Sequence, residues 1–253
     1  ESVNISKIAE EMIINTLKEL DPHSVYVPEK DVEEENESMQ GNFEGIGVQF
    51  NLLNDTIIIV APTPGGPSEK AGIMAGDRIV EIAGEKVSGM GITTEGVRNR
   101  LMGPKGTTVN VKIFRKGTSR LLSYNITRDK IPMNSLDAAY IIAPGTAYIK
   151  LNRFSETTPG EFDNAVAYLS GQKMENLIID LRGNSGGIMT SAVNIADEML
   201  DPGKLIVSIK GYHTSRQDFL STTIETLRNT RIAVLTDEGS ASASEILAGA
   251  VQD

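Results

Sequence analysis

The sequence predicts an α/β protein in which a small β-rich module interrupts a larger chain. Apolar residues near the N-terminus recur at helical spacing. Short strands separated by glycine and proline turns then fill roughly ninety residues, the size of a compact module. After residue 131 strands alternate with helices, a pattern typical of parallel pairing with right-handed crossovers. We therefore divide the chain into a helical segment at 1–40, a module at 41–130 and an α/β core at 131–253.

The N-terminal segment should form an amphipathic helix over residues 3–20, ended by Pro22. Such a helix packs internally or forms a homo-oligomer through its apolar face. The acidic stretch at 29–38 is expected to be a solvated helix face or a loop. The residues of the apolar face are Ile5, Ile8, Ala9, Met12, Ile13, Leu17 and Leu20.

The middle module is predicted to contain short strands and two helices. Its expected elements are, in order, a strand pair joined at Asn54-Asp55, a short helix near 68–71, a strand at 78–82, a turn at Ala83-Gly84, a helix at 93–102 and a hairpin that turns at Lys116-Gly117.

The core is predicted to alternate strands and helices. Ligands of open parallel sheets bind at the C-terminal ends of the strands, so the loops there are the candidate site. The expected elements are the strand TAYIKLNRFS, the helix TPGEFDNAVAYLS, the strand and loop NLIIDLRGNSGG, the helix IMTSAVNIADEML, the strand KLIVSIKG and the strand–loop–helix unit RIAVLTDEGSASASEILAGAVQD.

Composition excludes several classes of function. The formal net charge of −10 argues against nucleic acid and anionic membranes, both of which need basic patches. The absence of cysteine removes disulfides, thiol nucleophiles and cysteine-bound metals. The two histidines are scattered: His23 is expected to be structural and His213 exposed, which makes a zinc site improbable. We expect no metal and no organic cofactor.

The run Gly45, Ile46, Gly47 and Val48 places a glycine loop before a strand. Such a loop can aim successive backbone N–H groups at a carboxylate, while the strand edge accepts a peptide. Val97 and Leu101 on the following helix would form the other wall of that groove. With KAGIMAGDRIVEIAGEKV downstream, the module resembles the PDZ domain of bacterial proteases. The alternative is a small β-module that binds nothing.

Two strand–loop–helix units of the core carry the candidate chemistry. DLRGNSGG at 180–187 and TDEGSASASE at 236–245 both follow strands, so both loops should lie on the same side of the sheet. The glycine loop can present N–H groups, and the serine loop opens a helix whose positive end stabilises an oxyanion. One of the serines at 240, 242 and 244 could merely cap that helix, but three exceed what a cap needs.

Other nucleophile arrangements fit less well. The serine loop is not G-x-S-x-G, and no GK[ST] follows a glycine loop, so an α/β-hydrolase elbow and a P-loop are disfavoured. A serine without a histidine needs another base, usually a neutral and partly desolvated lysine. Lys150, Lys204 and Lys210 are expected to be surface charges.

LDPHSVYV, GIGVQF, GPKGT, YIKLNRFS, LIIDLRGNSGG and DEGSASASEILAGAVQD occur in this order. Together they resemble the C-terminal processing (tail-specific) peptidases, which are serine–lysine proteases. The resemblance implies a ClpP/crotonase-like α/β protease core with an inserted PDZ domain. It implies Ser242 as nucleophile, with the N–H groups of Ala243 and of Gly186 or Gly187 as oxyanion hole. It also implies that residues 45–48 bind the peptide carboxylate.

The chain departs from the family pattern after the serine. The general-base lysine of the family lies roughly two dozen residues beyond the nucleophile. The sequence stops at Asp253, so we expect a C-terminally truncated core whose base lies outside it.

The resemblance implies a serine endopeptidase that cleaves proteins near an apolar free C-terminus and is extracytoplasmic, either periplasmic or anchored on the outer side of the inner membrane. The chain as given should lack activity. One alternative is a PDZ-containing fragment that binds C-termini without cleaving them. A crotonase-type acyl-CoA enzyme is a second alternative, against which the PDZ stretch and the serine loop both argue.

Overall fold

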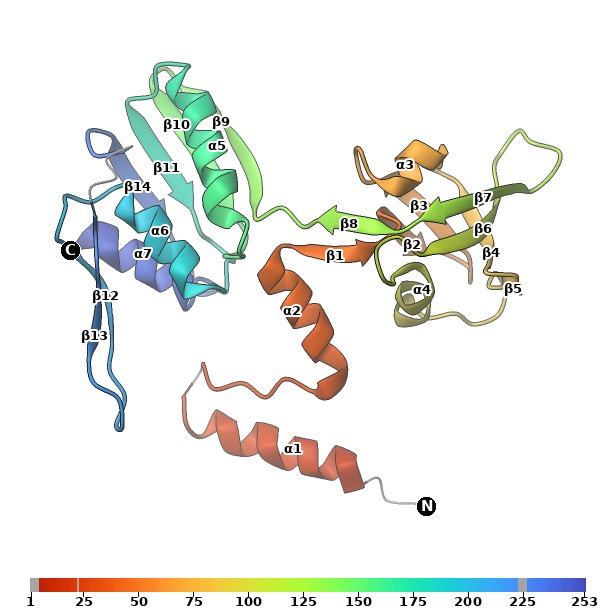
Figure 1. The fold of residues 1–253 in the computed structure, drawn as a ribbon, viewed down its shortest axis with the longest axis horizontal. Coiled ribbons are helices and arrows are strands. Elements are labelled where there is room, and N and C mark those ends of the chain that lie inside the picture. Colours follow the sequence, from red (N-terminus) through yellow and green to blue (C-terminus); the bar gives the residue numbers. More distant parts are fainter. Residues whose placement is uncertain (1–4, 22, 223–226) are drawn as a thin grey trace. The chain divides into compact units, whose positions relative to one another are not determined.

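The computed structural model describes residues 5–21, 23–222 and 227–253. The chain divides into two compact units, residues 42–133 and residues 1–41 together with 134–253 (Figure 1). The N-terminal segment therefore groups with the core, and the middle module forms the second unit by itself.

The middle unit is built on an antiparallel sheet in the order β2-β3-β4-β6-β7, which leaves β2 at an edge. The predicted strand pair and hairpin are confirmed, because β2 pairs with β3 and β6 with β7. Asn54 and Asp55 both have positive φ, as the tight turn between β2 and β3 requires. The elements are β2 (Val48–Leu52), β3 (Ile57–Pro62), α3 (Pro67–Ala71), β4 (Arg78–Ile82), β5 (Glu85–Lys86), α4 (Thr94–Leu101), β6 (Thr108–Phe114) and β7 (Leu122–Thr127).

The chain enters and leaves this unit along two paired strands. β1 (Asn42–Gly45) lies antiparallel to β8 (Asp129–Pro132), with Asn42 opposite Pro132. Sequence reasoning missed this ribbon because neither strand is long enough to show a hydrophobic period. Its strands bring the two ends of the insertion together, which suits a module inserted into another domain.

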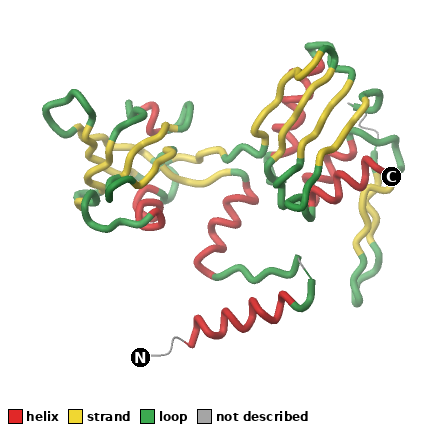
Figure 2. The backbone as a smooth tube through the Cα atoms, turned by 180° about the vertical axis from the view of Figure 1, so that it is seen from behind, coloured by secondary structure: helices red, strands yellow, loops and turns green. Residues whose placement is uncertain are grey.

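The core unit contains a four-stranded sheet in the order β14-β11-β10-β9. The parallel pairing expected from the alternating pattern is confirmed for β10 (Thr146–Leu151), β11 (Asn176–Asp180) and β14 (Arg231–Leu235). The helices α5 (Thr158–Ser170), α6 (Met189–Asp197) and α7 (Ala243–Gln252) cover one face of this sheet (Figures 1 and 2). Their apolar sides and the facing strand residues form one buried cluster.

Two strands of the core differ from the simple alternating expectation. β9 (Leu136–Ala143) joins the sheet antiparallel to β10, as an edge strand. β12 (Leu205–Ile209) does not enter the parallel sheet but pairs antiparallel with β13 (Gln217–Leu220) in a separate ribbon. Local sequence does not distinguish these outcomes, because neither LDAAYIIA nor LIVSI carries a pattern that fixes the partner or the direction of its strand.

The N-terminal segment forms two helices. α1 (Ile5–Lys18) matches the predicted amphipathic helix but buries none of its residues. The acidic stretch is helical: η1 (Glu29–Asp31) leads into α2 (Val32–Gln40), which ends on Gly41 with φ of 72°. A side chain at Gly41 would meet the hydroxyls of Thr157 and Ser155, so glycine is required there sterically as well.

Candidate active site

The two loops singled out in the sequence lie side by side. β11 and β14 are parallel neighbours, with Asp180 opposite Leu235, and the Leu181 N–H donates to the Leu235 carbonyl at 2.8 Å. Both strands therefore end at the same edge of the sheet, as expected. The glycine loop follows β11, and the serine loop follows β14 and leads into α7.

Hydrogen bonds from the two flanking serines join these loops. The Ser240 hydroxyl donates to the Leu181 carbonyl at 2.8 Å. The buried Ser244 hydroxyl donates to the Asn184 carbonyl, also at 2.8 Å. Asp237 adds a third link, because its carboxylate accepts the Gly183 N–H at 2.8 Å, and this bond is the first of several that hold the pKa of Asp237 low. Ser240 and Ser244 therefore hold the two loops together by hydrogen bonds.

Ser242 differs from both neighbours. Its side chain is exposed, and its backbone has φ of 55° and ψ of −113°. These angles match the first central position of a type II′ turn, near +60° and −120°, where glycine is usual. The Ser244 N–H closes that turn by donating to the Ala241 carbonyl at 3.0 Å. A serine held in a sparsely populated conformation at the start of a helix is a mark of a functional position.

Gly186 packs directly against this turn. A Cβ atom built on Gly186 would lie 2.7 Å from the Ser242 Cβ and 2.9 Å from the Ala243 nitrogen. The backbone of the glycine loop therefore borders the space into which the first N–H of α7 can donate. The Gly186 N–H itself donates to the Asn184 side-chain oxygen at 2.9 Å.

Gly187 is the remaining predicted oxyanion donor. It forms a parallel bridge with Phe154, in which Phe154 N–H donates to Gly186 and Ile188 N–H donates to Phe154. Neither bond uses the Gly187 N–H. Gly187 has a φ of 133°, and a Cβ atom built on it would overlap the Phe154 carbonyl oxygen, so no other residue fits there.

Asn184 supports the glycine loop and was not identified from the sequence. It is fully buried. Its side-chain nitrogen donates to the Leu151 carbonyl at 3.1 Å, its side-chain oxygen accepts from Gly186, and its own carbonyl accepts the Ala241 N–H at 3.1 Å. The available signal was an asparagine in a glycine-rich loop at the end of a strand, since the side chain of asparagine commonly replaces missing backbone hydrogen bonds in such loops.

A buried carboxylate anchors the start of the same loop. Asp180 accepts hydrogen bonds from the guanidinium and N–H of Arg182, from the Tyr148 hydroxyl at 2.7 Å and from the Lys150 ammonium at 3.2 Å. These donors, Arg182 first, hold the pKa of Asp180 well below its ordinary value. Lys150 also donates to the Arg182 carbonyl. The expectation that Lys150 is a surface charge is therefore wrong, whereas Lys204 and Lys210 are exposed as expected.

A cavity of about 550 Å³ opens beside Ser242. Apolar residues of β12 and α7, among them Ile206 and Ile246, line it together with Ser242 and Glu245. His23, expected only to be structural, also lines it. His213 is exposed as expected and meets the Tyr212 ring edge-on, with ring centroids 4.7 Å apart.

Of the residues predicted to bind peptide, Gly45 to Val48 lead into the edge strand of the middle unit's sheet, and Val97 and Leu101 lie on α4. Gly45 and Gly47 flank Ile46, whose side chain is buried and whose carbonyl accepts hydrogen bonds from the N–H and the hydroxyl of Ser68. The Ile46 side chain and carbonyl are therefore both engaged within the unit. Val48 begins the edge strand β2. On α4, Val97 and Leu101 are 0% and 3% exposed and belong to the hydrophobic core. A peptide would have to separate α4 from the core to reach these two side chains.

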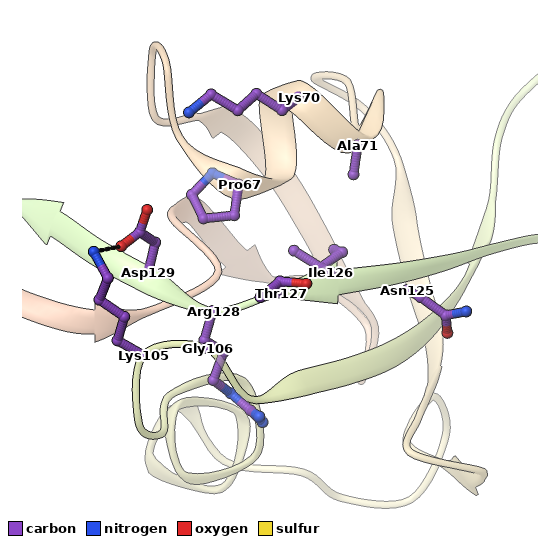
Figure 3. Close-up of a pocket in the computed structure, with 10 residues that line it drawn as sticks. All are labelled: Pro67, Lys70, Ala71, Lys105, Gly106, Asn125, Ile126, Thr127, Arg128 and Asp129. Atoms are coloured by element: carbon purple, nitrogen blue, oxygen red, sulfur yellow. Dashed lines mark ion pairs between the residues drawn. The ribbon is translucent and has the colours of Figure 1, made fainter.

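A second cavity of about 400 Å³ lies elsewhere on the same unit, between α3 and β7 (Figure 3). Lys105 and Asp129 form an ion pair of 2.6 Å at its rim. None of the six residues predicted to bind peptide, all of which the structure describes, lines this cavity. We assign it no part in peptide binding.

Two protein-family models match parts of the chain. Residues 145–253 match the model of peptidase family S41, and residues 45–126 match that of the PDZ domain. Carboxy-terminal processing protease CtpB of Bacillus subtilis is 35% identical over 256 residues, which cover 100% of this chain and 53% of the relative.

A carboxy-terminal-processing protease of Bartonella bacilliformis is 33% identical, over 98% of this chain and 57% of the relative. The solved photosystem II D1 C-terminal processing protease is 28% identical over 100% of this chain and 69% of that one, with a TM-score of 0.46. The chain thus spans little more than half the length of the two sequence relatives. The chain contains a region that matches peptidase family S41 and a region that matches the PDZ domain, and its sequence relatives are carboxy-terminal processing proteases.

Proposed function

We propose that this chain carries the nucleophile and the oxyanion hole of a serine endopeptidase that works by acyl transfer. The observation that carries the proposal is that the three serines of the loop have different roles. Ser240 and Ser244 fasten the loops, while Ser242 is exposed in a strained turn against Gly186. Ser242 is also the N-cap residue of α7, where Glu245 completes a capping box, but a cap alone needs neither the strain nor the glycine backbone opposite it.

The mechanism follows from these positions. The Ser242 oxygen attacks the scissile carbonyl carbon while its proton passes to a base, and the resulting oxyanion accepts hydrogen bonds from N–H groups. Ala243, at the positive end of α7, supplies one donor, and Gly187 supplies the second because the Gly186 N–H is engaged by Asn184. Collapse of the intermediate releases the amine, and water then hydrolyses the acyl-enzyme.

We propose that the base is a lysine outside these 253 residues, which makes the site a serine–lysine dyad. The family resemblance supports this assignment. Lys150, the one lysine tied to the glycine loop among the described residues, is held by Asp180 and the Arg182 carbonyl. It therefore serves the loop and not Ser242. On this proposal the 253-residue chain alone is inactive.

The PDZ domain would select substrates through their free, apolar C-termini. Support comes from the edge position of β2, which can accept a peptide as an added strand, and from the glycine loop of residues 45–48 before it. Because Val97 and Leu101 are buried, binding would require α4 to move, which would couple substrate recognition to a conformational change.

Two further proposals concern assembly and location. The exposed apolar residues of α1, including Ile5 and Met12, support a homo-oligomer formed through this helix. The family resemblance supports an extracytoplasmic location, in the periplasm or on the outer side of the inner membrane. Within the described part of the chain, no helix combines the length and apolarity that crossing a membrane requires.

The activity is tested with a peptide that ends in apolar residues, presented with a free or an amidated C-terminus. Protein expressed from the complete coding sequence should cleave the free form, and the Ser242→Ala variant should cleave neither. Binding of the free peptide without cleavage would instead establish the alternative, a PDZ protein that captures C-termini on an inactive scaffold. Cleavage that survives Ser242→Ala would refute the assignment of the nucleophile.

A further inference from the structure

His23 comes from the N-terminal segment, more than two hundred residues before the serine loop, yet it lies beside α7. Its Nε2 is 3.6 Å from Oε2 of Glu245. Both side chains are 58% exposed, so the pair is accessible to solvent and neither residue is needed to fill the core.

The turn that presents His23 is itself ordered by hydrogen bonds. One carboxylate oxygen of Asp21 accepts the His23 N–H at 2.8 Å, and the other accepts the Ser24 hydroxyl at 2.7 Å. The hydroxyl bond is the main reason that the pKa of Asp21 is lowered. The backbone of His23 is thereby fixed by its own neighbours, which leaves the imidazole free to serve another element.

The partner of His23 is the residue that holds the nucleophile's backbone. The same Oε2 of Glu245 accepts the Ser242 N–H at 2.6 Å. That bond stabilises the one serine of the loop whose φ is positive. A single carboxylate oxygen thus connects His23 to the strained residue.

His23 also lines the cavity beside Ser242. Apolar residues of β12 and α7 also line it, Ile206, Ile246 and Ala250 among them. A substrate whose carbonyl carbon lies at the Ser242 hydroxyl would place an adjacent side chain in this cavity, because Ser242 is part of its lining.

We propose that His23 is a positioning residue of the nucleophile: it holds Glu245 against the Ser242 N–H, and its ring walls the cavity that receives the substrate beside that serine. The inference rests on the proposed function only in taking Ser242 as the nucleophile. The contact through Glu245 can be tested without any catalysis.

The first test is amide hydrogen exchange at Ser242, followed by NMR in the 253-residue chain. His23→Ala should speed exchange of this amide by about two- to fivefold, the range that a solvent-exposed side-chain contact supports. His213→Ala is the matched control, since it removes the other exposed histidine, and should leave the rate unchanged. His23→Gln, which keeps a hydrogen-bond donor, should restore part of the protection. Equal exchange in His23→Ala and His213→Ala would overturn the proposal.

The second test is acylation of Ser242 in the protein expressed from its complete coding sequence. Ser242 attacks a p-nitrophenyl ester, the nitrophenolate leaves, and the serine proton passes to the base. With the acetyl ester, His23→Ala should lower the acylation rate constant about two- to fivefold with little change in KM. With the longer valeryl ester, whose chain reaches the cavity, KM should rise as well.

The two tests separate the failure of the inference from that of the proposed function. If wild-type protein forms no acyl adduct at Ser242, the proposed function fails, and the exchange data alone decide whether His23 holds the turn. If wild-type protein is acylated and His23→Ala matches it with both esters, only the role of His23 is refuted.

Discussion

Replacing Gly186 with alanine should remove most of the reactivity of Ser242 and leave the protein folded. Gly186 has a φ of 104°, a conformation that alanine reaches only with strain. The added methyl would lie 2.6 Å from the Ala241 carbonyl and 2.7 Å from the Ser242 Cβ. It would also stand 2.9 Å from the Ala243 nitrogen, where the oxyanion must bind.

Gly186→Ala is expected to lower both the folding stability and the acylation rate. The unfavourable φ costs about 1–3 kcal/mol of folding stability, with relief of the clash adding to that figure. The loss of one oxyanion donor lowers the acylation rate about 10²- to 10³-fold, which is about 3–4 kcal/mol in the barrier. The rate therefore falls far more than the change in stability would produce, as long as the variant stays folded.

The assay compares Gly186→Ala with Gly183→Ala in the protein expressed from its complete coding sequence. Gly183 lies in the same loop with φ of 70°, but a Cβ atom added to it would meet nothing within 4 Å. Gly183→Ala should lose about 1–2 kcal/mol of stability and keep near-normal acylation by a p-nitrophenyl ester. A folded Gly186→Ala variant that is acylated at the wild-type rate would refute the placement of the oxyanion hole.

Three further predictions test the packing around the site by urea unfolding and acylation. Ser242→Gly should be more stable than Ser242→Ala by about 1 kcal/mol, because glycine relieves the positive φ, while both variants should lose acylation; equal stability would contradict the strain. Asn184→Ala should lose about 2–4 kcal/mol by leaving two buried backbone groups without side-chain partners, and a loss below 1 kcal/mol would contradict that role. Asp180→Asn should lose about 3 kcal/mol at pH 7, because it removes a buried charge partner. Since the folded pKa of Asp180 is depressed, its contribution is complete above the unfolded pKa near 3.9 and declines as the pH falls, so the gap between wild type and variant should be smaller at pH 3 than at pH 7.

Much of the fold could be predicted from local pattern. The positive φ values at Asn54 and Asp55 occur where the sequence indicated a hairpin turn, and β10, β11 and β14 pair in parallel as their alternation with helices implied. The course of β12 could not be predicted. Its apolar pattern suits a parallel sheet or a two-stranded ribbon equally, and only tertiary packing selects the ribbon.

The site was predictable to the extent that neighbouring parallel strands bring their loops together. That rule placed residues 180–187 beside 236–245. Composition could not reveal which serine is exposed, because the difference lies in hydrogen bonds of Ser240 and Ser244 to carbonyls of the other loop. The position of His23 near the site could not be predicted either, because its neighbour Glu245 is distant in sequence and no periodic pattern links the two residues.

The central claim, that Ser242 is the nucleophile, is tested most directly by mapping the acyl group. Protein from the complete coding sequence is reacted with p-nitrophenyl acetate, quenched in acid, digested and analysed by peptide mass spectrometry. One acetyl group is expected, on Ser242, and none is expected in Ser242→Ala or in the 253-residue chain alone. Acetylation of Ser240 or Ser244 in place of Ser242, or no adduct in the folded full-length protein, would contradict the account.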